Sequence, residues 1–281
     1  MMFDLPQHLF FPLAVLSAYL LYGAVLYSFG GTHGKERALD VWHRGGVGFL
    51  LFAAATVITI ALGAAVSFFI SQASAAFKTP QVAGEFKPVC LSHFTDRDYL
   101  RAVEKAYQCA VGVYRRYFDA IASGYGSIFT ATALTGVLVI TGGYSMGLSQ
   151  AAMPYSSAAT SALLALAAAV AATYVTYGFV LLMGLGAVLV AEEKTRHLGA
   201  LILGVAAGFP PALAGGADVL QTIKVPEVDW SKYIIFSSLI GVAADAAAVA
   251  AVTVTTLSVA AAAAYAISRI FDHAGAHLAI E

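Results

Sequence analysis

Long runs of apolar residues constrain this chain more than any other feature of its sequence. A helix needs about 20 apolar residues to cross the hydrocarbon core of a bilayer. Within lipid every backbone N–H and C=O must be paired inside the protein, and a helix achieves this locally. Six apolar blocks are long enough, at residues 9–29, 47–77, 121–148, 158–191, 198–221 and 233–268. We therefore predict an all-α fold, a polytopic transmembrane helix bundle with six to seven spans.

Three of these blocks, 47–77, 158–191 and 233–268, are longer than a simple span requires. Block 158–191 is predicted as one long tilted helix, or as a span with a re-entrant turn near residues 173–178. The composition agrees with a membrane location, because only 11% of residues are charged, whereas soluble domains carry about 25%. The formal net charge of −1 gives the whole chain no electrostatic attraction for nucleic acid.

Residues 78–120 interrupt the apolar pattern. We expect them to form an extramembrane insertion in a single transmembrane domain that covers residues 1–281. A capping box, Thr95 with Asp98 three residues later, predicts the start of an amphipathic helix. This helix either lies on the membrane surface or packs on a partner, and continues into the next span. Its apolar positions are Leu100, Val103, Tyr107, Ala110, Val111, Tyr114, Phe118 and Ile121.

The two cysteines of the chain, Cys90 and Cys109, both fall in this insertion. A disulfide between them would close a loop of roughly 20 residues and contribute about 3 kcal/mol by chain-entropy reckoning. Such a bond needs an oxidising side of the membrane or a hyperthermophilic cell. The alternative is a pair of inert buried thiols. We predict the disulfide, because nothing else explains why both cysteines are confined to this segment.

Sequence motifs of catalysis and metal binding are absent. The chain has no HExxH, no GxSxG, no glycine fingerprint for dinucleotides and no Cys/His cluster with metal spacing. We therefore expect no enzyme, and assign no catalytic, cofactor-binding or metal-binding residue.

Asp245 is an acid inside the last apolar block, where a charge is costly and usually marks function. Ser238 and Thr256 fall within about 20° of it on a helical wheel, and Gly241 lies one turn away. The stripe Ser238, Gly241, Asp245 and Thr256 is predicted either to line a pore or proton path, or to form a helix interface in which Asp245 bonds to a neighbour.

Pro210 and Pro211 lie in the middle of the fifth block, where they remove two amide hydrogens from a helix. We predict a helix break here. A broken helix at the midplane is typical of transporter sites; the alternatives are a packing kink and a hairpin that does not cross the membrane.

Orientation follows from the distribution of Lys and Arg. In a six-span scheme, loop 30–46 shares a side with 149–157 and 222–232, and these carry five Lys or Arg against ten on the other side. Seven of the ten belong to segment 78–120, which alone would place that segment in the cytoplasm. A folded insertion is a weaker signal than a short loop, and a disulfide favours the outside. We therefore predict a multi-pass protein of the cell membrane with the 78–120 insertion extracellular.

The sequence contains no Asn and six Gln. Asn is thermolabile, so its loss is typical of thermophilic proteins. Alternatively, apolar spans simply use few amides.

The order of these parts resembles a known family. The chain resembles the TrbL-like inner-membrane components of type IV secretion systems in its layout. This layout consists of two spans, an insertion ending in an amphipathic helix, and then a Gly/Ala-rich bundle. Among archaea, segments 88–125, 173–193 and 199–220 resemble the CedA family of crenarchaeal DNA-import systems, which fits the thermophilic composition.

This resemblance implies a channel or platform component of a conjugation-like machine that imports DNA. It implies small membrane partner subunits, a cytoplasmic ATPase, DNA as cargo and contact with membrane lipids. It carries over no catalytic residue. Two other functions stay open: a secondary transporter using Asp245 and the Pro210–Pro211 break, and a structural membrane subunit of a larger assembly.

Overall fold

The computed structural model describes residues 7–76, 88–95, 101–137, 142–226 and 237–278, and every regular element among them is helical. The all-α prediction is confirmed. The elements in chain order are α1 (Gln7–Phe29), α2 (Gly31–Ala76), the 3₁₀ helix η1 (Leu91–Phe94), α3 (Ala102–Val137), α4 (Gly142–Leu181), α5 (Met183–Ala191), α6 (Arg196–Leu220) and α7 (Ser237–Leu278).

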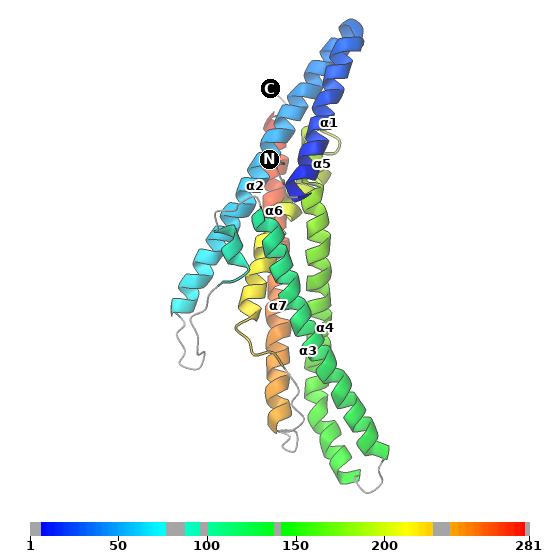
Figure 1. Ribbon diagram of the computed structural model, residues 1–281, viewed down its shortest axis with the longest axis vertical. Coiled ribbons are helices and arrows are strands. Elements are labelled where there is room, and N and C mark those ends of the chain that lie inside the picture. Colours follow the sequence, from blue (N-terminus) through cyan, green and yellow to red (C-terminus); the bar gives the residue numbers. More distant parts are fainter. Residues whose placement is uncertain (1–6, 77–87, 96–100, 138–141, 227–236, 279–281) are drawn as a thin grey trace, which may run out of the picture.

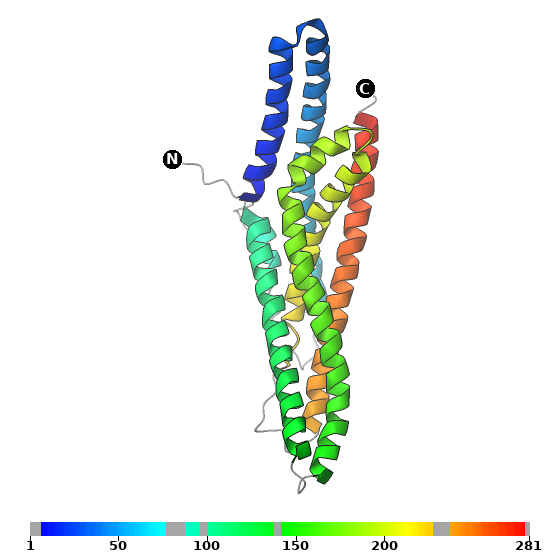
Figure 2. The same ribbon diagram turned by 90° about the vertical axis from the view of Figure 1, so that its right-hand side faces the viewer.

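The helices form one elongated bundle whose members follow its long axis (Figure 1). The α1–α2 hairpin projects from one end, and the α3–α4 hairpin lies at the other (Figure 2). The α5–α6 turn and the C-terminal end of α7 lie toward the same end as the α1–α2 hairpin. The described ends of α2 and α6 and the start of α7 point the opposite way.

Five of the described helices are long and apolar enough to cross a membrane: α1, α2, α4, α6 and α7. These helices identify a membrane protein. Helix α6 differs from the others, because 67% of its most apolar window is buried inside the bundle, against 22–33% for the rest. Helix α6 takes this central place because it packs against α2, α3, α4, α5 and α7.

Glycine lets α6 and α7 approach each other closely, as small residues do in membrane bundles. A Cβ atom added at Gly204 would lie 2.4 Å from the carbonyl oxygen of Ala264. One added at Gly216 would lie 2.2 Å from a methyl carbon of Thr256. No larger side chain fits at either position without moving α7.

The predicted helix break at Pro210–Pro211 is wrong, because α6 runs unbroken from Arg196 to Leu220 with both prolines inside it. The prolines remove the amide donors that would pair with the carbonyls of Ala206 and Ala207. Neighbouring helices surround α6 on most sides and hold its path despite these lost bonds.

The predicted third span is also not a single helix. Block 121–148 is divided between the end of α3 and the start of α4, and these two helices run side by side (Figure 2). The predicted loop 149–157 lies within α4, which continues through Pro154. Block 158–191 does break, but at Leu182, not within residues 173–178.

This division changes which loops share an end of the bundle. The six-span scheme placed 30–46 and 192–197 on opposite sides, and the structure contradicts it. Arg44 of α2 pairs with Glu192 of the α5–α6 turn, so both segments lie at one end. Loop 222–232 begins where α6 stops, farther along the bundle and away from the α1–α2 hairpin (Figure 1). Because block 121–148 does not cross the membrane as one helix, each connection after it lies on the side opposite to the one that the six-span scheme predicts.

Segment 78–120 is less separate than the sequence suggests. Its described parts, η1 and α3, pack against α2, α4 and α6. Thr95 is the C-terminal cap of η1, and the described part of the amphipathic helix begins after residue 100. Asp98, its predicted capping partner, lies outside the described residues. The helix continues to Val137, as predicted, and its apolar face packs inside the chain.

Candidate functional site

Asp218 lies near the C-terminal end of α6 and is fully buried. Its two carboxylate oxygens accept three backbone hydrogen bonds from the turn that precedes and opens η1. Val89 and Cys90 donate to Oδ1 at 3.0 and 2.8 Å, and Leu91 donates to Oδ2 at 2.8 Å. Bonds to an ionised acceptor are the strong ones, so Asp218 attaches this turn firmly to the central helix.

The same turn is held in two further ways. Cys90 forms a disulfide with Cys109 of α3, with their Cα atoms 5.4 Å apart, as the sequence predicts. The ring of Phe94 in η1 packs directly on Gly63 of α2. A Cβ atom added at Gly63 would lie 2.2 Å from a carbon of this ring. The cysteine turn, residues 88–94, therefore joins α2, α3 and α6.

Two buried tyrosines of α3 bond to the backbone of α6. The Tyr114 hydroxyl donates to the carbonyl of Leu213 at 2.9 Å. The Tyr117 hydroxyl lies within hydrogen-bonding distance of the carbonyls of Leu220, at 2.7 Å, and Ile223, at 2.5 Å. The Leu220 carbonyl also accepts a bond from the Ile223 N–H at 3.0 Å, so Tyr117 joins α3 to the turn that follows α6.

The environment of Tyr114 favours its neutral form. Burial raises the pKa of the Tyr114 hydroxyl well above its ordinary value, and the negative charge of Asp218 adds to this effect. The hydroxyl therefore keeps the proton that it donates to α6.

An apolar groove lies next to this anchored region, between α2, α6 and α7. Its volume is about 390 Å³. Glycines 208, 215 and 216 and Pro211 form its α6 side. Side chains of α2 and α7 form the flanks, including Val66, Ile70, Ala251, Thr255, Thr256 and Val259. Ala251, Thr255 and Val259 are exposed, so the groove opens at the side of the bundle.

The predicted polar stripe does not act as one surface. Thr256 is buried against Gly216 of α6 and its hydroxyl donates to the carbonyl of Val252 at 2.8 Å. Gly241 is exposed with open space beside it. Asp245 is half-buried and does not line the groove. The side chain of Ser238 lies outside the described residues. Thr256 thus fits the interface alternative.

The two prolines face different neighbours. Pro211 lines the lateral groove with α2 and α7. Pro210 lines a small apolar cavity with α3 and α4, beside Tyr107 and Thr176. Both prolines therefore serve the packing of α6 against the helices around it.

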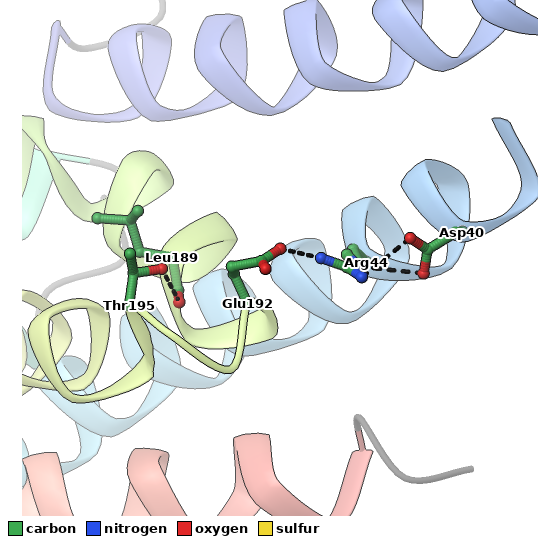
Figure 3. A network of polar contacts seen from close by, with 5 residues as sticks. All are labelled: Asp40, Arg44, Leu189, Glu192 and Thr195. Atoms are coloured by element: carbon green, nitrogen blue, oxygen red, sulfur yellow. Dashed lines mark hydrogen bonds and ion pairs between the residues drawn. The ribbon is translucent and has the colours of Figure 1, made fainter. Parts of the chain in front are cut away.

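A polar network lies at the other end of the bundle, near the α1–α2 hairpin (Figure 3). Arg44 of α2 lies between Asp40 of its own helix and Glu192 of the α5–α6 turn. Its Nε donates to Asp40 Oδ1 at 3.0 Å. Nearby, His197 lies 3.0 Å from Asp272 of α7. These contacts tie α2, α6 and α7 together where the apolar part of the bundle ends.

No group of three His, Cys, Asp or Glu side chains that could hold a metal ion occurs in the part of the chain that the structure describes. Sequence reasoning missed the anchoring role of Asp218, although the signal was present. That signal is an acid near the end of an otherwise apolar block, because a buried carboxylate must accept hydrogen bonds from neighbouring donors.

Comparison with known proteins finds no matching family model, no matching curated protein and no matching solved structure. The geometry of the site therefore has to support any functional proposal.

Proposed function

We propose that the chain is a membrane channel or platform component of a conjugation-like machine that imports DNA. The observation that carries this proposal is the lateral groove between α2, α6 and α7. The groove is apolar, opens at the side of the bundle and has a floor of glycine. The exposed α7 residues Ala251, Thr255 and Val259 line its opening, so the groove suits apolar side chains of a partner subunit's transmembrane helix.

The groove favours an assembly subunit over a secondary transporter. A transporter binds its substrate near the midplane, commonly at broken helices, whereas α6 is continuous and Asp245 lies away from the groove. We therefore assign transport of DNA to the assembled machine. Small membrane subunits would occupy the groove, a cytoplasmic ATPase would supply the energy, and DNA would be the cargo.

The end of the bundle that carries the α1–α2 hairpin faces the cytoplasm in this proposal. Its connections and the C-terminal region contain six Lys or Arg, namely Lys35, Arg37, Arg44, Lys194, Arg196 and Arg269. Outside segment 78–120 the sequence has two more, namely Lys224, which follows α6, and Lys232, which lies outside the described residues. The positive-inside rule favours this orientation, and it leaves the disulfide nearer the outside, where oxidation is possible.

A groove-blocking variant tests the proposal. Ala251 is exposed on α7 and lines the groove, whereas Ala248 is exposed on α7 and does not. Ala251→Trp should fill the groove and reduce cell-to-cell DNA uptake at least about tenfold, since a hot-spot contact contributes roughly 2 kcal/mol. Ala248→Trp should leave uptake unchanged. Equal uptake in both variants, with equal membrane levels, would contradict the proposal.

Photo-cross-linking identifies the occupant. Val259 lines the groove and Val254 does not, and each side chain is 54% exposed. A photoreactive residue at position 259, but not at 254, should capture a membrane protein of one or two spans. Capture at both positions alike, or of soluble proteins alone, would argue against a groove-bound partner helix.

A further inference from the structure

A second cavity lies between α3 and the segment that follows α6, and has a volume of about 290 Å³. Its polar lining comes from Arg116 and Tyr117 of α3 and from Gln221 and Lys224 beyond α6. Three apolar side chains complete the wall. The cavity thus combines two cations with an amide and a phenol.

Among the residues that the structure describes, no acid lines this cavity to offset its positive charge. Within the described part of the chain, neither Arg116 nor Lys224 forms an ion pair. Asp119, three residues after Arg116 on α3, is exposed and does not line the cavity. Asp218 is engaged by three backbone amides, and Gln221 Nε2 lies 3.4 Å from its Oδ1.

The cavity walls are held in place by the contacts of Tyr117. Its hydroxyl is bonded to the carbonyls of Leu220 and Ile223, which fixes the chain just after α6 against α3. The positive charge of Arg116 partly offsets the effect of burial, which raises the pKa of this hydroxyl. Arg116 precedes Tyr117 on α3 and Lys224 follows Ile223, and both line the cavity.

The position of the cavity identifies the kind of anion. The apolar span of α6 ends at Leu220, and Gln221 and Lys224 follow directly. Side chains just beyond a span lie at the level of lipid headgroups. Basic pockets between helices at this level suit anionic headgroups, and the apolar wall suits the glycerol and the first carbons of the lipid tails.

We propose that this cavity binds the phosphate of an anionic membrane lipid. Arg116 would hold two phosphate oxygens through its planar guanidinium group, and Lys224 would act as a point charge on the third. The Gln221 amide would donate to an ester oxygen. The lipid would then bridge α3 and the end of α6, next to the cysteine turn.

Native mass spectrometry of the full-length protein in detergent tests this site. The probe is phosphatidylglycerol, with zwitterionic phosphatidylcholine as the comparison lipid. The double variant Arg116→Gln/Lys224→Gln should bind phosphatidylglycerol at least about tenfold more weakly than the native chain, because each basic residue contributes about 1 kcal/mol near an anionic surface. The matched control is Lys35→Gln/Arg37→Gln, which removes two exposed positive charges at the other end of the bundle and should bind normally.

Three outcomes overturn the proposal. Equal lipid binding by the two double variants would show that the cavity is not the site. Displacement of the lipid by inorganic phosphate at matched concentration would assign the cavity to free phosphate. Loss of single-stranded oligonucleotide binding in Arg116→Gln/Lys224→Gln, with lipid binding unchanged, would assign it to nucleic acid. Unchanged helix content and melting temperature show that each variant is folded.

Discussion

At the scale of single residues, the buried carboxylate of Asp218 accepts three backbone hydrogen bonds from the cysteine turn. A carboxylate inside an apolar core costs several kcal/mol unless donors surround it. Three amides of the cysteine turn provide those donors. The charge that would weaken an apolar helix therefore becomes the attachment point of the segment packed beside it.

Asp218→Asn should destabilise the protein by about 2 kcal/mol, because the amide has one acceptor oxygen and turns an N–H group toward a backbone donor. Thermal unfolding in detergent measures the loss. Asp119→Asn, which removes an exposed acid from α3, should change stability by less than about 0.5 kcal/mol. Equal melting temperatures for the two variants would contradict the anchoring role.

Tyr114→Phe should cost about 1 kcal/mol through loss of the bond to Leu213. The raised pKa of Tyr114 adds a dependence on pH. Its stabilising effect is complete below the unfolded pKa of about 10 and is lost as pH rises above that value, because only the unfolded chain then ionises.

Unfolding of both proteins at pH values of about 9 and 11 measures this dependence. The stability difference between the native chain and Tyr114→Phe should become smaller at the higher pH. A difference that stays constant or grows would show that Tyr114 ionises freely in the folded state.

At the scale of elements, η1 depends on its neighbours for its place. It has only four residues, and a 3₁₀ turn of that length has little stability of its own. Asp218, the disulfide and the contact of Phe94 with Gly63 hold it between three helices. Segment 78–120 is thereby built into the bundle at η1 and α3.

Cys90→Ser/Cys109→Ser should destabilise the protein by about 3 kcal/mol, the chain-entropy value for closing a loop of this length. Melting under non-reducing conditions measures it. Because the disulfide and Asp218 hold the same turn, their effects should not add, and a double-mutant cycle with Asp218→Asn should give a coupling of about 0.5 kcal/mol or more. Free thiols at both positions in mass mapping of the native protein would remove the basis of this prediction.

At the scale of the whole molecule, the division of block 121–148 decides the topology. Segment 30–46, which is mostly the start of α2, and the α5–α6 turn lie toward one end of the bundle, whereas α6 runs away from that end. The pairing of Arg44 with Glu192 connects the α1–α2 hairpin to the rest of the bundle at that end (Figure 3).

Cysteine labelling with a membrane-impermeant maleimide tests this topology in intact cells. Lys35→Cys and Lys194→Cys should behave alike and stay unlabelled if they face the cytoplasm. Thr222→Cys, an exposed site at the other end, should be labelled. Opposite labelling of positions 35 and 194 would restore the six-span scheme. The native cysteines do not react, because they are joined in a disulfide.

The sequence by itself determined the fold class, the membrane location and the cysteine pair, because long apolar runs have one stable form in lipid and two cysteines allow one pairing. Periodicity also predicted the apolar face of α3. Only the tertiary structure decided that Pro210 and Pro211 leave α6 unbroken, that Thr256 packs on Gly216, and that Asp218 holds the cysteine turn. Those outcomes depend on which helices lie side by side, and contacts between distant segments leave no periodic signal in the chain.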